Sequence, residues 1–329
     1  MVDLNLLDLE SSDIEKGRFV TRVRKIEIPV TLPNRKALID ELATTIATLK
    51  QEDLTKKRSI LPWVSALLVR AVLFIVLSIL TQIGGLIYVL TLIISKKLSL
   101  NKLKTRLLFV GCYLLFTLVI TPLIAPLFGR VALPLNGNLR PQNYLTILLN
   151  RHYVKQDLKA QLVSAASTMH DQFPDTSVKY LDANFPFIKG FPLLPHLSHN
   201  DGRKVDLGFV YTDKETGLAT DSSPSPMGYG VYESPRESET NYAQKCKAEG
   251  YWQYGFLERL VPQWRADNYT VDVERTKALI SILLTHKETS KIFIEPHLKV
   301  RWGLSQYDKV RFHGCQAVRH DDHIHLQTE

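Results

Sequence analysis

The hydrophobic positions divide this chain into a membrane-like part and a globular part. Two long runs, Ala71–Ile94 and Leu107–Phe128, contain no charged residue. Each is about as long as the ~20 residues that a helix needs to cross the hydrocarbon core of a bilayer. Both lie too far from the N-terminus, and lack the cleavage pattern, to be signal peptides. The sequence therefore predicts transmembrane helices within residues 59–130 and a protein that stays anchored.

The residues before these runs are mixed and charged. Within the N-terminal region 1–58, the apolar positions of Ala37–Leu49 recur with a helical period after the turn signal Pro33-Asn34. We expect an amphipathic helix there, and no residue of this region stands out as catalytic.

Basic residues beside the runs predict the orientation in the membrane. The loop between the runs carries five of them and no acid: Lys96, Lys97, Lys102, Lys104 and Arg106. The positive-inside rule places this loop in the cytoplasm and the C-terminal half outside. By the same rule, the region before the first run also belongs in the cytoplasm, because it carries Lys56, Lys57, Arg58 and Arg70. A re-entrant or double pass over Ile60–Ser95 would place both basic regions in the cytoplasm. The alternative is that the C-terminal half is itself cytoplasmic.

The C-terminal part has the pattern of a globular domain. Helical periodicity marks Asn143–Met169 and Thr276–His286, whereas Val178–Phe187 and Ile292–Trp302 have the pattern of strands. Strands separated by irregular loops and a few helices are typical of α+β domains. We expect residues 135–329 to form an α+β domain with a small antiparallel sheet and flanking helices.

The basic composition of the chain and the positions of its basic residues bear on what the protein binds. The 41 Lys and Arg residues exceed the 33 acidic ones, a net charge of +8, but they form no basic stripe with interleaved aromatic residues, so we expect no nucleic-acid partner. Many of them flank the apolar runs, where anionic lipid attracts them. Of the three cysteines, Cys112 lies in an apolar run, whereas Cys246 and Cys315 could pair in an exported domain.

Two histidine-rich clusters in this domain hold the residues that could bind a transition metal. In the second cluster, Phe312–Gln327, an extended HDDHIHL segment would place His323 and His325 on one face and Ile324 and Leu326 in the core. Imidazole is the commonest zinc ligand, and catalytic zinc sites use three protein ligands and one open position.

The first cluster, Pro195–Phe209, supplies the complementary ligands. Lys204–Phe209 alternates, so Asp206 faces away from its apolar neighbours, and the turn residues after His199 can fold this histidine back toward Asp206. Two nitrogens and one carboxylate oxygen, from His199, His325 and Asp206, would suit zinc.

These clusters resemble the two signature blocks of the LAS metallopeptidases, named for lysostaphin, D-alanyl-D-alanine peptidases and sonic hedgehog. His199 precedes Asp206 by seven positions in SHNDGRKVDL, and the chain closes with HDDHIHL. Within the family, the sequence is similar to the penicillin-insensitive murein endopeptidase branch, because the Glu that carboxypeptidase relatives carry two residues before the final ligand is missing. The resemblance extends to YLDANFPF, VERTKALISILL and IFIEPHLKV, and covers the C-terminal domain only.

The resemblance implies a role for each residue of the site. His199, Asp206 and His325 would be the zinc ligands, His323 would act as base or stabilise the transition state, and His320 would be a further active-site histidine. Asp321 or Asp322 would orient one of the histidines. His196 and His313 are interpreted as structural or peripheral.

The function that these observations favour is hydrolysis of peptide bonds in bacterial murein. The expected protein is a zinc peptidase anchored in the cytoplasmic membrane, with its catalytic domain on the periplasmic side. Two alternatives stay open: a zinc-stabilised module of the same fold that binds cell-wall or protein ligands without cleaving them, and a peptidase that acts in the cytoplasm.

Overall fold

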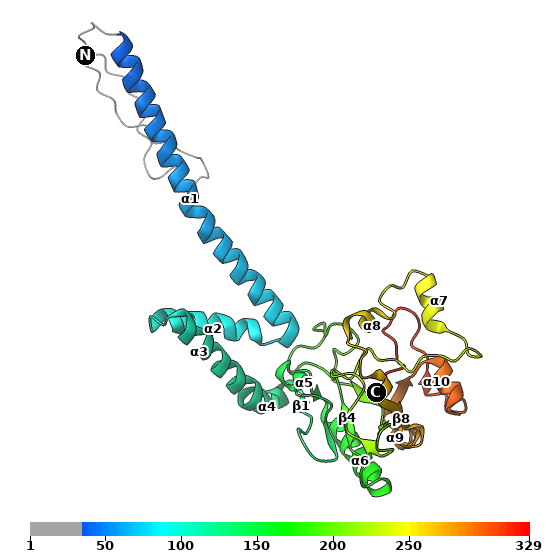
Figure 1. The fold of residues 1–329 in the computed structure, drawn as a ribbon. Helices are drawn as coiled ribbons and strands as arrows, with labels where there is room; N and C mark the ends of the chain where they lie inside the picture. Colours follow the sequence, from blue (N-terminus) through cyan, green and yellow to red (C-terminus); the bar gives the residue numbers. More distant parts are fainter. Residues whose placement is uncertain (1–34) are drawn as a thin grey trace. The chain divides into compact units, whose positions relative to one another are not determined.

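The computed structural model describes residues 35–329, which Figure 1 draws in colour. The chain divides into two compact units, and the boundary between them follows Val69. The turn signal Pro33-Asn34 and the rest of residues 1–34 lie outside the described residues. Helix α1 (Arg35–Thr81) includes the stretch Ala37–Leu49, for which the sequence predicts a helix.

Two helical segments are long and apolar enough to cross a membrane, Pro62–Thr81 and Lys102–Phe128. Their mean hydropathies are 2.5 and 2.4, and only 6% and 11% of their most apolar windows are buried within the protein. Apolar side chains exposed on this scale need a cover other than water. The second segment contains the predicted run Leu107–Phe128.

The first predicted span is wrong in its boundaries, because the helix breaks inside Ala71–Ile94. Gln82 has a φ of +66°, which ends α1, and helix α2 begins at Gly84 and ends at Lys97. The Thr81 hydroxyl accepts a hydrogen bond from the Gly84 amide and so stabilises the break. At 1.5 Å per residue, α2 is only about 21 Å long, shorter than the ~30 Å hydrocarbon core.

The chain then continues as one apolar helical segment of mixed geometry. Asn101 caps helix α3 by accepting a hydrogen bond from the Lys104 amide. The segment ends where Gly129 adopts a left-handed φ of +70°. Its successive parts are α3 (Lys102–Leu115), η2 (Phe116–Ile120), α4 (Thr121–Ile124) and η3 (Ala125–Phe128).

The C-terminal domain is built on a six-stranded mixed sheet of order β10-β9-β11-β5-β4-β2. The four inner strands are antiparallel to one another, while the edge strands β10 and β2 are parallel to β9 and β4. The α+β class is confirmed, but the sheet is larger than predicted and mixed rather than antiparallel. Its strands are β2 (Leu139–Pro141), β4 (Val178–Tyr180), β5 (Lys204–Gly208), β9 (Thr289–Phe293), β10 (Val310–Arg311) and β11 (His323–Thr328).

One face of this sheet forms the hydrophobic core. Helices α6 (Gln156–Gln172) and α9 (Val273–Thr285) contribute Leu162 and Leu279, which join Leu207, Ile324 and Leu326 from the sheet in one buried cluster. Because strand residues alternate between faces, the neighbours of these apolar residues point to the opposite face. That opposite face carries the histidines.

Three predicted elements differ from the structure for local reasons. The expected helix Asn143–Met169 is interrupted at Asn150, whose φ is +57°, before α6 begins. The expected strand Ile292–Trp302 ends at Phe293, because Pro296 is pre-organised for the first turn of α10 (Pro296–Arg301). In Val178–Phe187 only β4 is a strand, because Ala183 and Asn184 bond instead to Arg151 and Tyr153.

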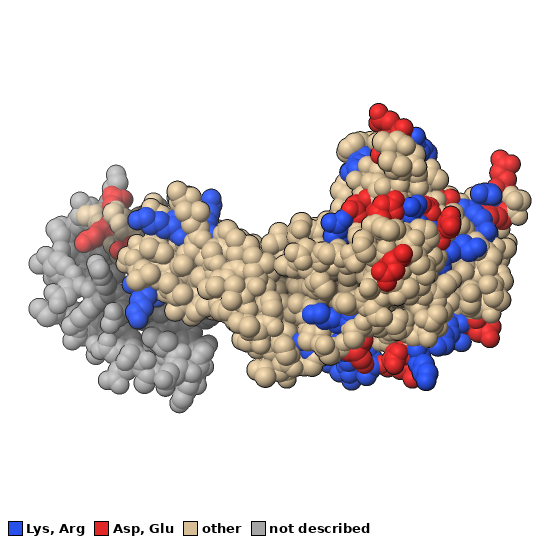
Figure 2. Space-filling view, turned by 90° about the horizontal axis from the view of Figure 1, so that it is seen from below, with Lys and Arg blue, Asp and Glu red and all other residues tan. Residues whose placement is uncertain are grey.

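The remaining elements are short and surround the central sheet. Two strands pair as β1 (Val131–Ala132) and β3 (Tyr153–Val154), and three form a second sheet, β6 (Tyr211–Asp213), β7 (Ala219–Thr220) and β8 (Tyr269–Val271). The short helices are α5 (Leu145–Leu148), α7 (Tyr242–Ala248), α8 (Phe256–Leu260) and η4 (Ala266–Asn268). Acidic and basic side chains intermingle on the face drawn in Figure 2, which shows no extended area of one sign on the domain.

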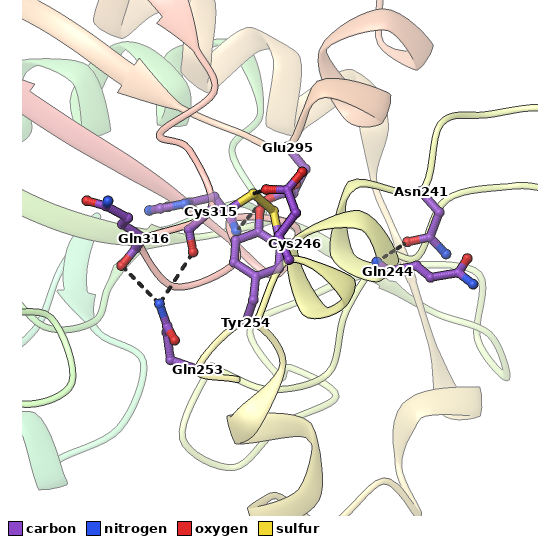
Figure 3. The surroundings of a disulfide bond; sticks show 10 residues. Asn241, Gln244, Cys246, Gln253, Tyr254, Glu295, Cys315 and Gln316 are labelled. Carbon is purple, nitrogen blue, oxygen red and sulfur yellow. Dashed lines mark hydrogen bonds between the residues drawn. A yellow bond between two sulfur atoms is a disulfide. The ribbon is translucent and has the colours of Figure 1, made fainter. Parts of the chain in front are cut away.

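A disulfide joins Cys246 to Cys315, so the pairing that the sequence allowed is present (Figure 3). Cys246 lies on α7 and is fully buried, whereas Cys315 lies on the loop that leads to β11. The amide of Gln253 donates further hydrogen bonds to the carbonyls of Cys315 and Gln316. The disulfide therefore ties two surface segments together close to the histidine-rich end of the chain.

Candidate metal centre

Strand pairing places two of the predicted ligands opposite each other. In the antiparallel pair β5–β11, His325 is in register with Asp206, and His323 with Gly208. Ile324 and Leu326 are fully buried in the core, as the alternation predicts, so His323 and His325 share the other face. The register alone brings the His325 imidazole to the Asp206 carboxylate.

His199 reaches the same place from a loop. Its Nδ1 donates a hydrogen bond to the carbonyl of Ala183 at 2.7 Å, which leaves Nε2 as the free nitrogen. Asn184 holds the following turn, because its side chain accepts from the Gly202 amide and donates to the Lys204 carbonyl. The turn after His199 therefore folds back onto β5, as the sequence predicts.

The three predicted ligand atoms converge within the described structure. His325 Nδ1 lies 2.9 Å from Asp206 Oδ1 and 3.1 Å from His199 Nε2, and His199 Nε2 lies 3.3 Å from Asp206 Oδ1. His199 and Asp206 are fully buried, and His325 is 3% exposed. Buried groups of this kind are normally paired or coordinate a metal.

A second histidine competes for the same carboxylate. His196 Nδ1 lies 3.1 Å from Asp206 Oδ2, and His196, His199 and Asp206 offer ligand atoms that all lie within 4.8 Å of one another. The structure thus contains a buried His-His-Asp group that could hold a metal ion. The ring centroid of His199 lies 4.8 Å from that of His325 and 5.4 Å from that of His196, so both histidines are within reach of an ion held by His199.

The predicted catalytic histidines lie beside this group. The Asp322 carboxylate accepts a short hydrogen bond from His323 Nδ1, and Asp322 itself accepts from the Gly230 amide at 2.6 Å. His323 Nε2 lies 3.7 Å from Asp206 Oδ1 and has no hydrogen-bond partner among the described residues. The His320 ring centroid lies 4.9 Å from that of His323. Of the two candidate orienting acids, Asp322 contacts a histidine of the pair directly.

Asp321 takes a different role from Asp322. Its carboxylate binds the Arg319 guanidinium, and this guanidinium also lies 3.8 Å from the centroid of the Tyr232 ring. Burial raises the pKa of Asp321 to about 7 against the opposing effect of Arg319. Asp321 therefore anchors the loop before β11.

The charge state of the cluster suits a cation. Burial raises the pKa of Asp206, but the neighbouring His199, His323 and His196 outweigh it and hold this pKa well below its usual range. Burial lowers the pKa of His325 to about 3 and that of His320 well below the ordinary value. An ionised Asp206 and a neutral His325 are the forms of these two residues that bind a metal.

His323 differs from these neighbours. Burial lowers its pKa, but the carboxylates of Asp206 and Asp322 outweigh burial and raise the pKa to about 9. Without a metal ion, His323 therefore carries a proton at neutral pH. A dication bound beside it would oppose that charge and favour release of the proton.

The sequence analysis interprets His196 as structural or peripheral, but this residue belongs to the group that could hold a metal. Sequence reasoning missed two further residues. The first is Tyr229, whose hydroxyl donates to Asp206 Oδ2 at 2.8 Å and accepts from the Asp182 amide. The second is Asp182, whose Oδ2 lies 3.6 Å from His196 Nδ1 and accepts a hydrogen bond from Arg151. For His196 the signal was its spacing of three from His199, but no pattern in the sequence marks Tyr229 or Asp182 as neighbours of Asp206.

Comparison with known proteins adds no identification. No model of a protein family matches the chain, and no curated protein is similar to it. The family assignment therefore stays a resemblance of motifs, and function has to be argued from the site.

Proposed function

We propose that the protein is a membrane-anchored zinc-dependent peptidase that hydrolyses peptide bonds in bacterial murein. The observation that carries this proposal is the convergence of His199 Nε2, Asp206 Oδ1 and His325 Nδ1 within 2.9–3.3 Å of one another. Nitrogen and oxygen ligands of a tetrahedral zinc ion at ~2.0–2.2 Å lie about 3.3–3.6 Å apart. The three ligand atoms would fit around this ion if they lay slightly farther apart than in this structure.

When bound there, zinc would supply a Lewis acid that acidifies a water molecule and polarises a carbonyl group. His323 holds or releases a proton at Nε2, because its Nδ1 is fixed by Asp322. Tyr229 and the Ala183 carbonyl orient Asp206 and His199 through their second polar atoms, as outer partners of metal ligands do. The ring of His320 lies close to both His323 and His325, with centroid distances of 4.9 Å and 5.5 Å.

The same geometry supports the binding module as a second candidate. None of His196, His199, Asp206, His323 and His325 is more than 5% exposed. A structural zinc site is closed, whereas a catalytic one keeps a position for substrate. The segment that carries Tyr229 contacts Asp206 and Asp322 through Tyr229 and Gly230 and so adds to the burial of the group.

One substitution, His323→Ala, distinguishes the peptidase from the binding module. In the full chain, purified in detergent and loaded with zinc, cleavage of cross-linked murein peptides is followed by liquid chromatography and mass spectrometry. Loss of a general acid–base group lowers kcat by about 10²–10⁴-fold. We expect that loss with zinc content unchanged, and unchanged kcat in the control His286→Ala at the end of α9. Zinc-loaded wild-type protein that leaves every murein peptide intact would instead support the binding module.

The proposed location is outside the cytoplasmic membrane. The Cys246–Cys315 disulfide supports it, because such bonds persist in oxidising compartments. The basic loop between the candidate spans supports it through the positive-inside rule. A reporter enzyme that is active only outside the cytoplasm, fused after Glu329, should be active; an inactive fusion at normal expression would place the domain inside.

A further inference from the structure

An open cleft of about 480 Å³ lies where the second candidate span ends. Phe128, the last residue of that span, and Phe187 form one wall, with their ring centroids 5.0 Å apart. Three basic residues, Arg130, Lys155 and Lys189, also line the cleft. An apolar wall next to cations is the arrangement found where a protein surface meets lipid head groups.

The acids of the cleft neutralise its cations only in part. Asp201 is paired with Lys204 and also interacts electrostatically with Arg130, and Asp157 lies 3.7 Å from Arg203. Among the described residues, Lys155 and Lys189 form no ion pair with a carboxylate. These two lysines therefore offer positive charge to an anion.

Arg130 is built into the wall rather than left on the surface. It is 3% exposed, its Nη2 donates to the Asn200 carbonyl, and its Nη1 has no partner among the described residues. Gly202 makes room for it, because a Cβ there would lie 1.8 Å from Nη1. A buried guanidinium with an unused donor is costly unless an anion satisfies it.

The N-terminus of helix α6 also lies at the cleft. This helix of 17 residues begins at Gln156, and its N-cap Lys155 provides no side-chain hydrogen bond. Asp157 in the first turn accepts from the Leu158 amide and offsets part of the positive potential. The positive end of a helix dipole attracts phosphate groups.

We infer that this cleft binds the phosphate of an anionic membrane lipid, with the acyl chains lying along Phe128. The place of the cleft at the end of an apolar helix favours a lipid over a free phosphate. Leu127 and Ile188, 83% and 55% exposed, extend the apolar rim on either side. This inference rests on the membrane helices and the cleft, not on the proposed peptidase activity.

The cleft is connected to the candidate metal centre through one segment. Residues 187–202 contain Phe187, Lys189 and Asp201 of the cleft as well as His196 and His199. The Gly190 amide donates to the Asn200 carbonyl and closes this segment into a loop. A lipid held in the cleft should therefore reduce the mobility of the loop that carries His199.

The test uses the full chain in detergent and three soluble probes: dihexanoyl phosphatidylglycerol, dihexanoyl phosphatidylcholine and inorganic phosphate. Binding is measured by calorimetry, and hydrogen exchange of residues 187–202 is measured with and without probe. The cleft variant is Lys155→Gln with Lys189→Gln, two residues that are not deeply buried. The matched control removes the same charge at the exposed Lys214 and Lys287.

We expect phosphatidylglycerol to bind more tightly than phosphatidylcholine and to slow exchange in residues 187–202. The cleft variant should bind phosphatidylglycerol about 25-fold more weakly, since each basic residue near an anionic surface contributes about fivefold. The control should bind as the wild type does. Equal losses in the cleft and control variants, equal affinity for the two lipids, or inorganic phosphate binding as tightly as phosphatidylglycerol would each overturn the inference.

Discussion

Strands and loops contribute differently to the candidate metal centre. Asp206, His323 and His325 stand on two paired strands, where the register alone fixes which side chains face one another. His199 and Tyr229 come from loops and are placed by individual hydrogen bonds to Ala183 and Asp182. The strands thus form a rigid platform, and the loops complete the site through contacts that can be removed one at a time.

The largest loss of stability is expected from a substitution on the paired strands β5 and β11. Leu326→Ala leaves a cavity on the core side of β11, and deletions of this size cost about 2–5 kcal/mol of unfolding free energy. Chemical denaturation followed by circular dichroism measures the change. Gln327→Ala, on the same strand but at a half-buried position of the histidine face, should cost less than about 1 kcal/mol. Equal losses of unfolding free energy in the two variants would contradict the claim that one face of β11 packs in the core and the other does not.

The strand positions are also the part of the site that the sequence predicts. Alternation in KVDLGF and HDDHIHL correctly assigns Ile324 and Leu326 to the core and Asp206, His323 and His325 to the other face. The sequence cannot supply the loop contacts, since Tyr229 and Asp206 are 23 positions apart and meet only through the fold. The continuous apolar run does not reveal that its helix breaks at Gln82, although the Gly84-Gly85 pair is a turn signal and the alternative of a re-entrant pass over Ile60–Ser95 requires such a break.

The next largest loss of stability is expected when the disulfide that holds the loop before β11 is removed. Replacing Cys246 and Cys315 by Ala removes a cross-link that spans 69 positions, and bonds of this kind stabilise proteins by about 2–4 kcal/mol. The variant should unfold at lower denaturant concentration than the wild type, and a reducing agent should bring the wild type to the same midpoint. Cys112→Ala, which breaks no disulfide, serves as the control. A wild type insensitive to the reducing agent would show that the bond contributes little.

The smallest effect is expected on metal affinity, when a single hydrogen bond from a loop residue is removed. Tyr229→Phe removes the hydroxyl that donates to Asp206 Oδ2 at 2.8 Å but keeps the ring. Loss of an outer partner of a metal ligand weakens metal binding by about 10–100-fold, and we expect the lower end, because only one of two carboxylate oxygens is affected. Competition with a fluorescent zinc chelator measures the affinity. Tyr232→Phe, whose ring packs on Arg319, should leave the affinity unchanged.

The central claim is that His199, Asp206 and His325 share one metal ion, and the zinc content of three full-length proteins tests it most directly. Elemental analysis after dialysis against zinc at low concentration should find about one zinc per chain in the wild type and in His196→Ala. His325→Ala should retain none. A metal-free wild type, or a metal that survives His325→Ala but is lost in His196→Ala, would contradict the account.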